Sequence, residues 1–469
     1  MIASIAKYQR FSIVLVLLSA FVYFYIGYPL VRTDVTILIT LYTVGFASFL
    51  GLIQLKKNSF WFLAGIAIAF RLVFIGSIPN LSQDFYRFIW DGRMLIEGWN
   101  PYLYLPNDLM ASGTAPIAEA QELFNGMGDL SASHYTNYPP INQLCFAFAG
   151  LLSGKSIVGS VVVLRLLIIL ADIGTLYFGK KLLERLGLSV NNIWWYILNP
   201  FIIIELTGNL HFEGVMIFFV VWSLYLLHKG SWKLAAVVLA LSVSVKLIPL
   251  IFLPIFFQWF TKHKASELSK NTLPTIWKGV LKLLAFYGIV LTTIIILFLP
   301  FLSKQFIANY QETVELWFQN FEFNASFYYI ARWIGYETIG WNLIKDIGRV
   351  TPILVLIFVA GISLFRNNKD FQKTITALLF GLSFYFFTTT TMHPWYLATL
   401  LILSVFTNYR FTVVWSFMII FSYTAYQNEG YTENLGFVAL EYIVVYGFLI
   451  WELFLKKKRG KHLFSITKF

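Results

Sequence analysis

The sequence predicts an all-α polytopic membrane protein with about fourteen hydrophobic spans. Three observations predict this class. Of the 469 residues, 58% are hydrophobic and 12% are charged, apolar runs of span length recur along the chain, and Lys and Arg gather in alternate connecting segments. A soluble domain carries about 25% charged residues. We therefore expect one membrane-embedded body, a single domain over residues 1–469, rather than several soluble domains.

Each predicted span is an apolar run near the length that crosses a bilayer, about 20 residues of helix for a hydrocarbon core of roughly 30 Å. The runs cover residues 11–31, 35–55, 59–79, 157–179, 192–208, 212–228, 232–245, 247–260, 278–301, 348–365, 373–391, 395–408, 411–427 and 437–455.

The basic residues predict the orientation. With both termini in the cytoplasm, 24 of the 35 Lys and Arg fall in cytoplasmic segments, 8 fall in outer segments, and Arg71, Arg165 and Lys246 lie inside spans. Cytoplasmic loops of membrane proteins carry such an excess. The same distribution accounts for the net charge of +12 through topology and contact with anionic lipid, so no nucleic-acid partner is expected.

The segment 232–260 is too short for two full crossings, yet basic residues flank both of its ends. Pro249 and Pro254 interrupt the apolar run. We interpret it as a short hairpin that enters from the cytoplasm and turns back within the membrane. The alternative is one long tilted span, which would invert every segment downstream.

Two long outer segments follow from this topology. The first, 80–156, is rich in Asn, Pro and aromatic residues, and the second, 303–346, is amphipathic and aromatic. We expect them to form a partly helical cap over the membrane. The single cysteine, Cys145, rules out an intramolecular disulfide.

The densest group of chemically useful residues begins just after the third predicted span. Read as a helix, this stretch places Asp84, Arg87 and Asp91 on one face. A carboxylate kept ionised by a neighbouring guanidinium is suited to accept a proton from an alcohol. The alternative interpretation is an interfacial helix with a structural Asp–Arg pair.

This stretch resembles the first outer loop of the GT-C glycosyltransferase superfamily. The shared pattern is a span, an Asp, and then D-G-x(5)-G-x-N-P-Y, here beginning at Asp91 and ending at Tyr102. Two extra spans precede the loop here, where many members have one. Further matches, in the order and on the sides expected of the superfamily, are Tyr138-Pro139-Pro140, Asn209-Leu210-His211-Phe212-Glu213, Val245-Lys246-Leu247-Ile248-Pro249 and His393-Pro394-Trp395-Tyr396.

The resemblance is greatest to the polyprenyl-phosphate-mannose-dependent mannosyltransferases and their bacterial relatives. It implies transfer of a hexose, mannose by the resemblance alone, from a polyprenyl-phosphate donor to a hydroxyl of a glycan, glycolipid or protein acceptor. It also implies a site on the outer face of a bacterial cytoplasmic membrane. Asp84 matches the essential Asp of these enzymes and Asp91 is the second catalytic candidate. The predicted substrate-binding residues are Arg87, Arg93, Asn209, His211, Glu213, Lys246, His393, Trp395 and Tyr396.

Each predicted substrate-binding residue outside the first loop also has a simpler structural explanation. Asn209, His211 and Glu213 share one side if their loop is extended, and they bind sugar hydroxyls or simply make a short loop polar. Oxygen and imidazole ligands suit Mn²⁺ or Mg²⁺ only loosely, so the metal and any other cofactor stay unassigned. Lys246 contacts a lipid-linked phosphate or extends toward an interface.

His393, Trp395 and Tyr396 form a platform for a sugar ring or part of an aromatic belt. Two residues inside spans, Glu205 and Asp172, are expected to pair internally, for example with Arg165.

Two other classes of function fit a chain of this kind. A lipid-linked oligosaccharide flippase or another transporter predicts charged residues along a central cavity and an inverted repeat. This sequence instead concentrates its polar residues at the outer boundary. An inactive assembly partner is disfavoured by the intact set Asp84, Arg87 and Asp91.

Overall fold

The computed structural model describes residues 2–262, 273–427 and 431–456. Within these ranges the chain is helical and forms no strand; extended segments pair at one parallel bridge, between Phe323 and Thr391. The predicted all-α class is therefore confirmed for the described part of the chain. Some of the basic residues counted as cytoplasmic, in 263–272 and 457–469, lie outside the described residues.

Six helices of the described chain are long and apolar enough to cross a membrane, and a bent pair makes up to seven. The bent pair joins Pro200–Gly208 to Glu213–Lys229 at 116°. The long helices are α1 (Ile2–Gly27), α2 (Val35–Leu55), α8 (Ile157–Arg185), α14 (Leu273–Phe298), α17 (Ile344–Phe365) and α21 (Leu435–Ile450). These lengths confirm several spans but not the predicted fourteen.

The other apolar runs form helices that are shorter or interrupted. Prolines such as Pro200, Pro249 and Pro394 remove a backbone donor, and the chain around them adopts 3₁₀ or π geometry. Hydropathy records an apolar run but not such a break. The shorter elements are α3 (Phe60–Val73), η2 (Val190–Ile193), α9 (Trp194–Ile197), α10 (Pro200–Ile202), the π-helix η3 (Ile203–Gly208), α11 (Glu213–Lys229), α12 (Trp232–Val243), η4 (Ile248–Phe256), α13 (Phe257–Lys262), α18 (Phe371–Thr388), η6 (Pro394–Tyr396), α19 (Leu397–Val405), α20 (Phe411–Met418), η7 (Ile419–Tyr426) and the π-helix η8 (Trp451–Leu455).

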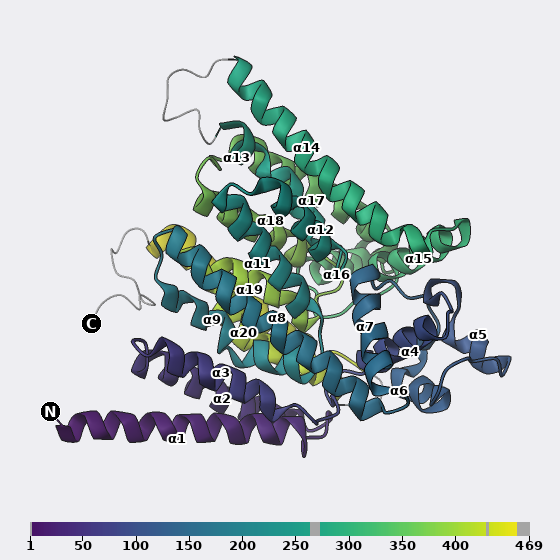
Figure 1. Cartoon of the computed structure of the whole chain (residues 1–469), viewed down its shortest axis with the longest axis horizontal. Helices are drawn as coiled ribbons and strands as arrows, with labels where there is room; N and C mark the ends of the chain where they lie inside the picture. Colours follow the sequence, from purple (N-terminus) through teal and green to yellow (C-terminus); the bar gives the residue numbers. More distant parts are fainter. Residues whose placement is uncertain (1, 263–272, 428–430, 457–469) are drawn as a thin grey trace.

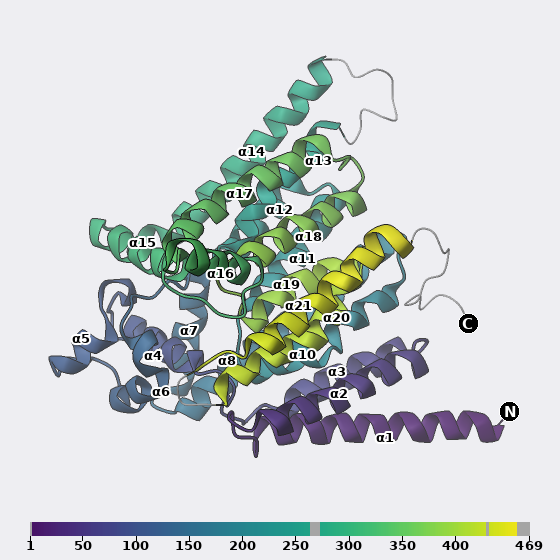
Figure 2. The same cartoon turned by 180° about the vertical axis from the view of Figure 1, so that it is seen from behind.

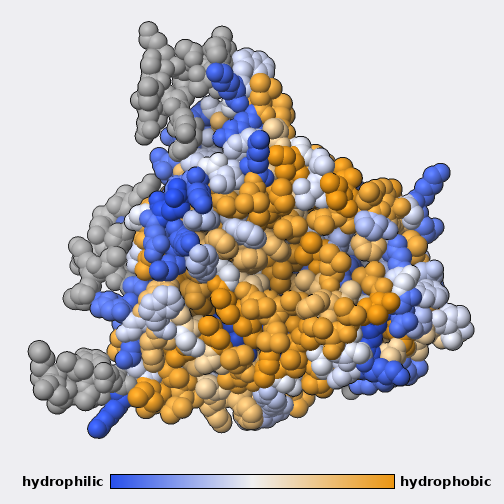
Figure 3. Space-filling model, in the orientation of Figure 1, coloured by the Kyte–Doolittle hydropathy of each residue, from blue (hydrophilic) through white to orange (hydrophobic). Residues whose placement is uncertain are grey.

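The two ends of the helical body differ in what they carry. The start of α1 and the C-terminal end of α21 lie at one end, and at the opposite end lie the helices of the two segments that the sequence predicts to be outer (Figures 1 and 2). An apolar belt separates two more hydrophilic edges of the visible face (Figure 3). The helices at the second end are α4 (Asp84–Ile96), η1 (Pro101–Leu103), α5 (Pro106–Ala111), α6 (Ala120–Ala132), α7 (Pro140–Ser153), η5 (Leu299–Phe301), α15 (Lys304–Gln319) and α16 (Phe327–Ile339).

The chain reverses within 232–260, as the predicted hairpin requires, and its depth in a membrane stays a prediction. Lys282 of α14 lies beside both ends of the segment, with its Nζ 5.4 Å from the ring centroid of Trp232 and 5.7 Å from that of Phe260. One continuous helix could not bring these two ends to the same level of α14. The turn between α12 and η4 contains Lys246. It lies toward the end of the body that carries α7.

The two predicted outer segments pack together as one cap. Asn309 Nδ2 donates to the carbonyl of Tyr102 at 2.9 Å, and the Thr313 hydroxyl donates to the carbonyl of Tyr135 at 3.0 Å. These bonds join α15 to η1 and to the irregular chain after α6, so the cap is built from both segments.

Candidate active site

Asp84 is the first residue of α4. The preceding Gln83 makes no side-chain cap, and the hydroxyl of Ser82 accepts the N–H of Asp84 at 3.4 Å instead. A carboxylate in the first turn of a helix is stabilised by the exposed N–H groups and the helix dipole. The Asp84 side chain is partly exposed, so its carboxylate is accessible.

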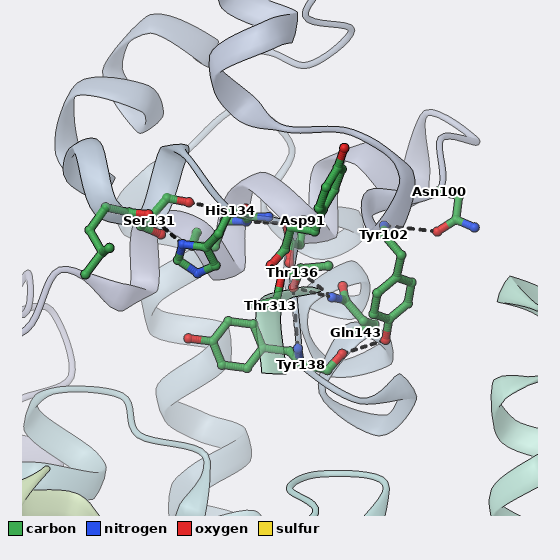
Figure 4. Close-up of polar contacts among 12 residues, drawn as sticks. Asp91, Asn100, Tyr102, Ser131, His134, Thr136, Tyr138, Gln143 and Thr313 are labelled. Carbon is green, nitrogen blue, oxygen red and sulfur yellow. Dashed lines mark hydrogen bonds and ion pairs between the residues drawn. The ribbon is translucent and has the colours of Figure 1, made fainter. Parts of the chain in front are cut away.

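Asp91, two turns further along α4, lies in the interior of the cap. Its Oδ1 is 2.8 Å from Arg87 Nε, and its Oδ2 accepts a hydrogen bond from Gln143 Nε2 at 3.0 Å. Asp91 is 0% exposed. Arg87 also donates to the carbonyls of Ser131 and His134, and Figure 4 shows Asp91 among these cap residues. The predicted Asp–Arg pair exists, and its carboxylate is Asp91.

Much of the D-G-x(5)-G-x-N-P-Y motif builds this scaffold. A Cβ on Gly92 would lie 2.2 Å from the carbonyl oxygen of Phe146, so only glycine allows α4 to pack this closely on α7. The Asn100 side chain accepts the N–H of Tyr102 at the start of η1. The Tyr102 hydroxyl then donates to the carbonyl of Tyr138 at 2.5 Å (Figure 4). The motif thereby fixes the position of Tyr138.

Arg93, predicted to bind substrate, also holds the cap together. It donates to the carbonyls of Ala118 at 2.6 Å and Lys155 at 2.9 Å. Arg93 is 4% exposed and Arg87 is 2% exposed. Both guanidinium groups are therefore bound within the cap, and Arg87 also interacts electrostatically with Tyr138.

Lys246 lies in the turn of the 232–260 hairpin, which docks on the start of α7. The carbonyls of Ser244 and Val245 accept hydrogen bonds from Ile141 N–H and Asn142 Nδ2, both at 2.9 Å. Lys246 Nζ is 2.7 Å from Oε1 of Glu213, the first residue of α11. The Lys246 side chain is 20% exposed, whereas that of Glu213 is 1% exposed.

Two tyrosines connect Lys246 to Asp84. Lys246 Nζ lies 5.9 Å from the ring centroid of Tyr138 and 5.6 Å from that of Tyr396. The Asp84 carboxylate interacts electrostatically with both tyrosines. Burial raises the pKa of Tyr138 well above its usual value, and Asp84 raises it further. Asp84, Tyr138, Lys246, Glu213 and Tyr396 therefore form one group, which we call the boundary cluster.

The loop before α11 is not extended, so Asn209, His211 and Glu213 do not share one side. Leu210 has φ 62°, a left-handed conformation that turns the chain. Asn209 Nδ2 donates to Glu205 Oε2 at 3.3 Å, and His211 Nδ1 lies 2.9 Å from the Glu205 carbonyl. Asn209 and His211 thus face Glu205 of η3, while Glu213 faces Lys246.

His393 and Trp395 lie beside the boundary cluster. Trp395 stacks on His211 with ring centroids 3.8 Å apart and on His393 with centroids 4.6 Å apart. Phe323, which pairs through its backbone with Thr390 and Met392, stacks on His393. Burial, and then the charge of Lys246, lowers the pKa of His393 to about 3, so this imidazole is neutral at physiological pH.

Arg32 is a candidate that the sequence analysis counted only toward topology. It lies in the turn between α1 and α2, and its guanidinium carbon is 3.5 Å from the ring centroid of Tyr426. Tyr426 interacts electrostatically with Asp84, and Arg32 interacts electrostatically with His393. The sequence did contain a signal for Arg32, namely a basic residue at the outer end of the first predicted span.

The sequence analysis named Arg165 as an example of a partner for Asp172, and this pairing was wrong. Asp172 pairs with Arg71 at 2.7 Å, and both side chains are buried. Arg165 instead donates to the carbonyls of Thr207 and Gly208. In the part of the chain that the structure describes, His, Cys, Asp and Glu do not form a group of three or more that could hold a metal ion.

Comparison with known proteins adds two family models. Residues 31–262 match the model described as "Alpha-(1->6)-mannopyranosyltransferase, N-terminal domain". Residues 207–452, more than half of the chain, match the model described as "Mannosyltransferase (PIG-M)".

Two curated proteins are similar to this chain, and both are named alpha-(1->6)-mannopyranosyltransferase A. That of Corynebacterium glutamicum is 24% identical over 359 residues, which is 71% of this chain and 68% of the relative. That of Mycobacterium tuberculosis is 22% identical over 188 residues, which is 40% of this chain and 34% of the relative.

Proposed function

The chain belongs to the mannosyltransferase family of the PIG-M model and is a multi-pass membrane mannosyltransferase of the GT-C type. From this premise we propose its donor, its mechanism and its site. The family decides between the enzyme and the transporter alternatives in favour of the enzyme. The donor is a polyprenyl-phosphate-linked mannose, and the acceptor is a hydroxyl at the outer face of the membrane.

The observation that supports this proposal most strongly is the boundary cluster. It combines a partly exposed carboxylate, Asp84, with the ammonium group of Lys246 and the rings of Tyr138 and Tyr396. An inverting displacement needs a base for the acceptor and a cation for the departing phosphate. Aromatic rings offer an apolar face to a sugar. All three requirements meet in this cluster.

Each residue then has one role. The acceptor O–H gives its proton to the Asp84 carboxylate, and its oxygen forms a bond to the anomeric carbon. The bond from that carbon to the phosphate oxygen breaks, and polyprenyl phosphate leaves with the electron pair. Lys246 stabilises the charge that develops on the phosphate. Glu213 holds Lys246 in place until the donor binds.

Three further side chains have supporting roles in this proposal. His393, neutral because its pKa is lowered to about 3, offers a hydrogen bond rather than a charge to the leaving phosphate. Trp395 is 9% exposed, so its role is to pack against His211 and His393 rather than to contact the sugar. Arg32, which stacks on Tyr426, is a second cation for the phosphate. No step requires a metal ligand from these residues.

We further propose that the cap faces the outside of the cytoplasmic membrane, with both termini in the cytoplasm. Three observations support this orientation: the count of basic residues, the bacterial relatives, and the location of the start of α1 and the end of α21 opposite the cap (Figures 1 and 2). The short apolar helices would then lie in the hydrocarbon beside the six long ones and account for further spans.

Labelling of single cysteines in a Cys145→Ser background tests this orientation. Lys304→Cys, at the start of α15, should react with a membrane-impermeant maleimide added from outside to intact cells. Lys369→Cys, between α17 and α18, should react only after the cells are opened. Reaction of both from the same side would contradict the proposed topology.

The donor is tested with the purified full chain in lipid nanodiscs. The relatives are named for alpha-(1->6)-mannopyranosyl transfer, so octyl α-mannoside is a suitable acceptor probe. We expect radiolabelled mannose to pass from polyprenyl-phosphate-mannose to the probe, and none to pass from GDP-mannose. Transfer from GDP-mannose alone would overturn the proposed donor.

A further inference from the structure

A chain of hydrogen bonds leads from the interior of the helical body to Asp84. The Tyr423 hydroxyl donates to Glu205 Oε1 at 2.6 Å. His211 Nδ1 lies 2.9 Å from the Glu205 carbonyl oxygen and 3.4 Å from its Oε2. His211 Nε2 lies 3.3 Å from the Ser82 hydroxyl, which accepts the N–H of Asp84 at 3.4 Å. Five residues from four separate segments therefore form one continuous path.

The direction of each bond follows from its partners. The two oxygens near His211 Nδ1 belong to Glu205, and a carbonyl oxygen can only accept, so Nδ1 carries the hydrogen. In a neutral imidazole Nε2 is then the acceptor. The Ser82 O–H donates to it, which directs a lone pair of the Ser82 oxygen toward the N–H of Asp84. In this neutral tautomer each hydrogen bond along the path has one donor and one acceptor.

The surroundings hold the imidazole in one orientation. The π-helix η3 places Glu205 beneath the loop that contains His211, and such local π geometry is frequent at functional sites. Trp395 stacks on the His211 ring at 3.8 Å with an interplanar angle of 22°. Glu205 is 3% exposed, His211 is 2% exposed and Ser82 is 6% exposed. Side chains buried to this degree support the site rather than bind a sugar.

We propose that His211, oriented by Glu205, is a positioning residue that sets Asp84 through Ser82. This inference rests on the proposed function, in which Asp84 takes the proton of the acceptor. The start of α4 has no side-chain cap from Gln83, so the Ser82 hydroxyl is what fixes the backbone of Asp84. A displacement of about 1 Å in such a residue costs about 10²-fold in rate.

Variants of Ser82 test the path with little change in volume. Ser82→Ala removes the donor to His211 and the acceptor for Asp84, and we expect kcat to fall about tenfold or more with the KM for octyl α-mannoside and for polyprenyl-phosphate-mannose unchanged. Ser82→Thr keeps the hydroxyl and should restore most of kcat. His211→Gln in the Ser82→Ala background should add little, because both changes break the same path.

The outcomes separate this inference from the proposed function. Wild-type kcat in Ser82→Ala, or a raised KM with unchanged kcat, would overturn the positioning role. Asp84→Asn is measured in parallel: if it is inactive while Ser82→Ala is fully active, only the inference fails. If Asp84→Asn is itself fully active, the proposed function fails. Should Ser82→Ala not fold, Ser82→Cys, whose thiol is a weaker donor, must show an intermediate kcat; wild-type kcat would overturn the inference.

Discussion

Two aspartates on one helix face of α4 have opposite surroundings. Asp91 is 0% exposed, and its two oxygens contact Arg87 and Gln143. Asp84 is partly exposed and is absent from the ion pairs that the described residues form within 4.0 Å. The same residue type at helical spacing thus gives one structural and one available carboxylate.

The difference shows what a reactive carboxylate requires. Removing either partner of a buried ion pair leaves the other charge uncompensated, at a high cost in free energy. Protonation of Asp91 would therefore break its ion pair with Arg87 and destabilise the cap. Asp84 is not held in such a pair; the nearby cations Lys246 and Arg32 contact Glu213 and Tyr426 instead. Four predictions test this contrast, beginning with the largest effect.

Asp84→Asn should lower kcat by about 10²–10⁴, because the amide keeps the shape of the side chain but cannot accept a proton as a base. Mannose transfer from polyprenyl-phosphate-mannose to octyl α-mannoside measures this loss. Asp108→Asn, in α5 of the same cap, is the matched control and should leave the rate unchanged. The melting temperature of Asp84→Asn should equal that of the wild type, and a large decrease would contradict the contrast with Asp91.

Asp91→Asn should act mainly on stability. It leaves the buried guanidinium of Arg87 without its counter-charge, and breaking such a pair costs about 3–5 kcal/mol. Thermal unfolding in detergent should therefore show a clear decrease in melting temperature. The folded fraction should keep most of its activity per molecule. Unchanged stability with lost turnover would assign the base to Asp91 instead.

Lys246→Ala should raise the KM for polyprenyl-phosphate-mannose about tenfold, the loss expected for one charge-assisted contact of about 1.5 kcal/mol. Lys246→Arg keeps the charge and should recover part of the affinity. Lys282→Ala removes a lysine at the basic end of the hairpin and serves as the control. An equal rise in KM for Lys282→Ala would show that general charge, and not the position of Lys246, attracts the donor.

Several parts of the molecule could be predicted from the sequence. Composition and the distribution of basic residues predict an all-α membrane body. Flanking charges and prolines predict the 232–260 hairpin. The motif order predicts that residues such as Lys246, Glu213 and Tyr396 come together, and the structure brings them together near Asp84. Their chemical roles stay predictions.

Other parts could not be predicted, for physical reasons. Periodicity shows which residues share a helix face but not which neighbour that face meets, so Asp84 and Asp91 could not be distinguished. A short polar loop gives no sign of a left-handed residue such as Leu210, which turns Asn209 and His211 inward. Hydropathy records the apolar runs but not the proline breaks that shorten their helices. The partner of Asp172 depended on packing across separate helices.

The smallest predicted effect concerns His134, which belongs to the surroundings of Asp91. Its carbonyl accepts a hydrogen bond from Arg87 at 3.1 Å, and its Nδ1 contacts the carbonyl of Leu130 at 2.5 Å. Burial, and then the charge of Arg87, lowers the pKa of His134 from 6.5 to about 4. The folded protein therefore keeps this imidazole neutral where the unfolded chain binds a proton.

Stability linked to His134 should be fully present above pH 6.5 and should decrease as the pH falls from 6.5 toward 4, since the unfolded state binds more protons in that window. His134→Asn removes the titration and keeps a donor for the Leu130 carbonyl. Melting temperatures from pH 7.5 to pH 4.5 should therefore fall less steeply for the variant. All other ionisable groups are common to both proteins, so the difference between the two slopes isolates His134. Parallel slopes would show that the proton affinity of His134 is the same in the folded and unfolded states. That result would contradict the effect of burial and of the Arg87 charge on its pKa.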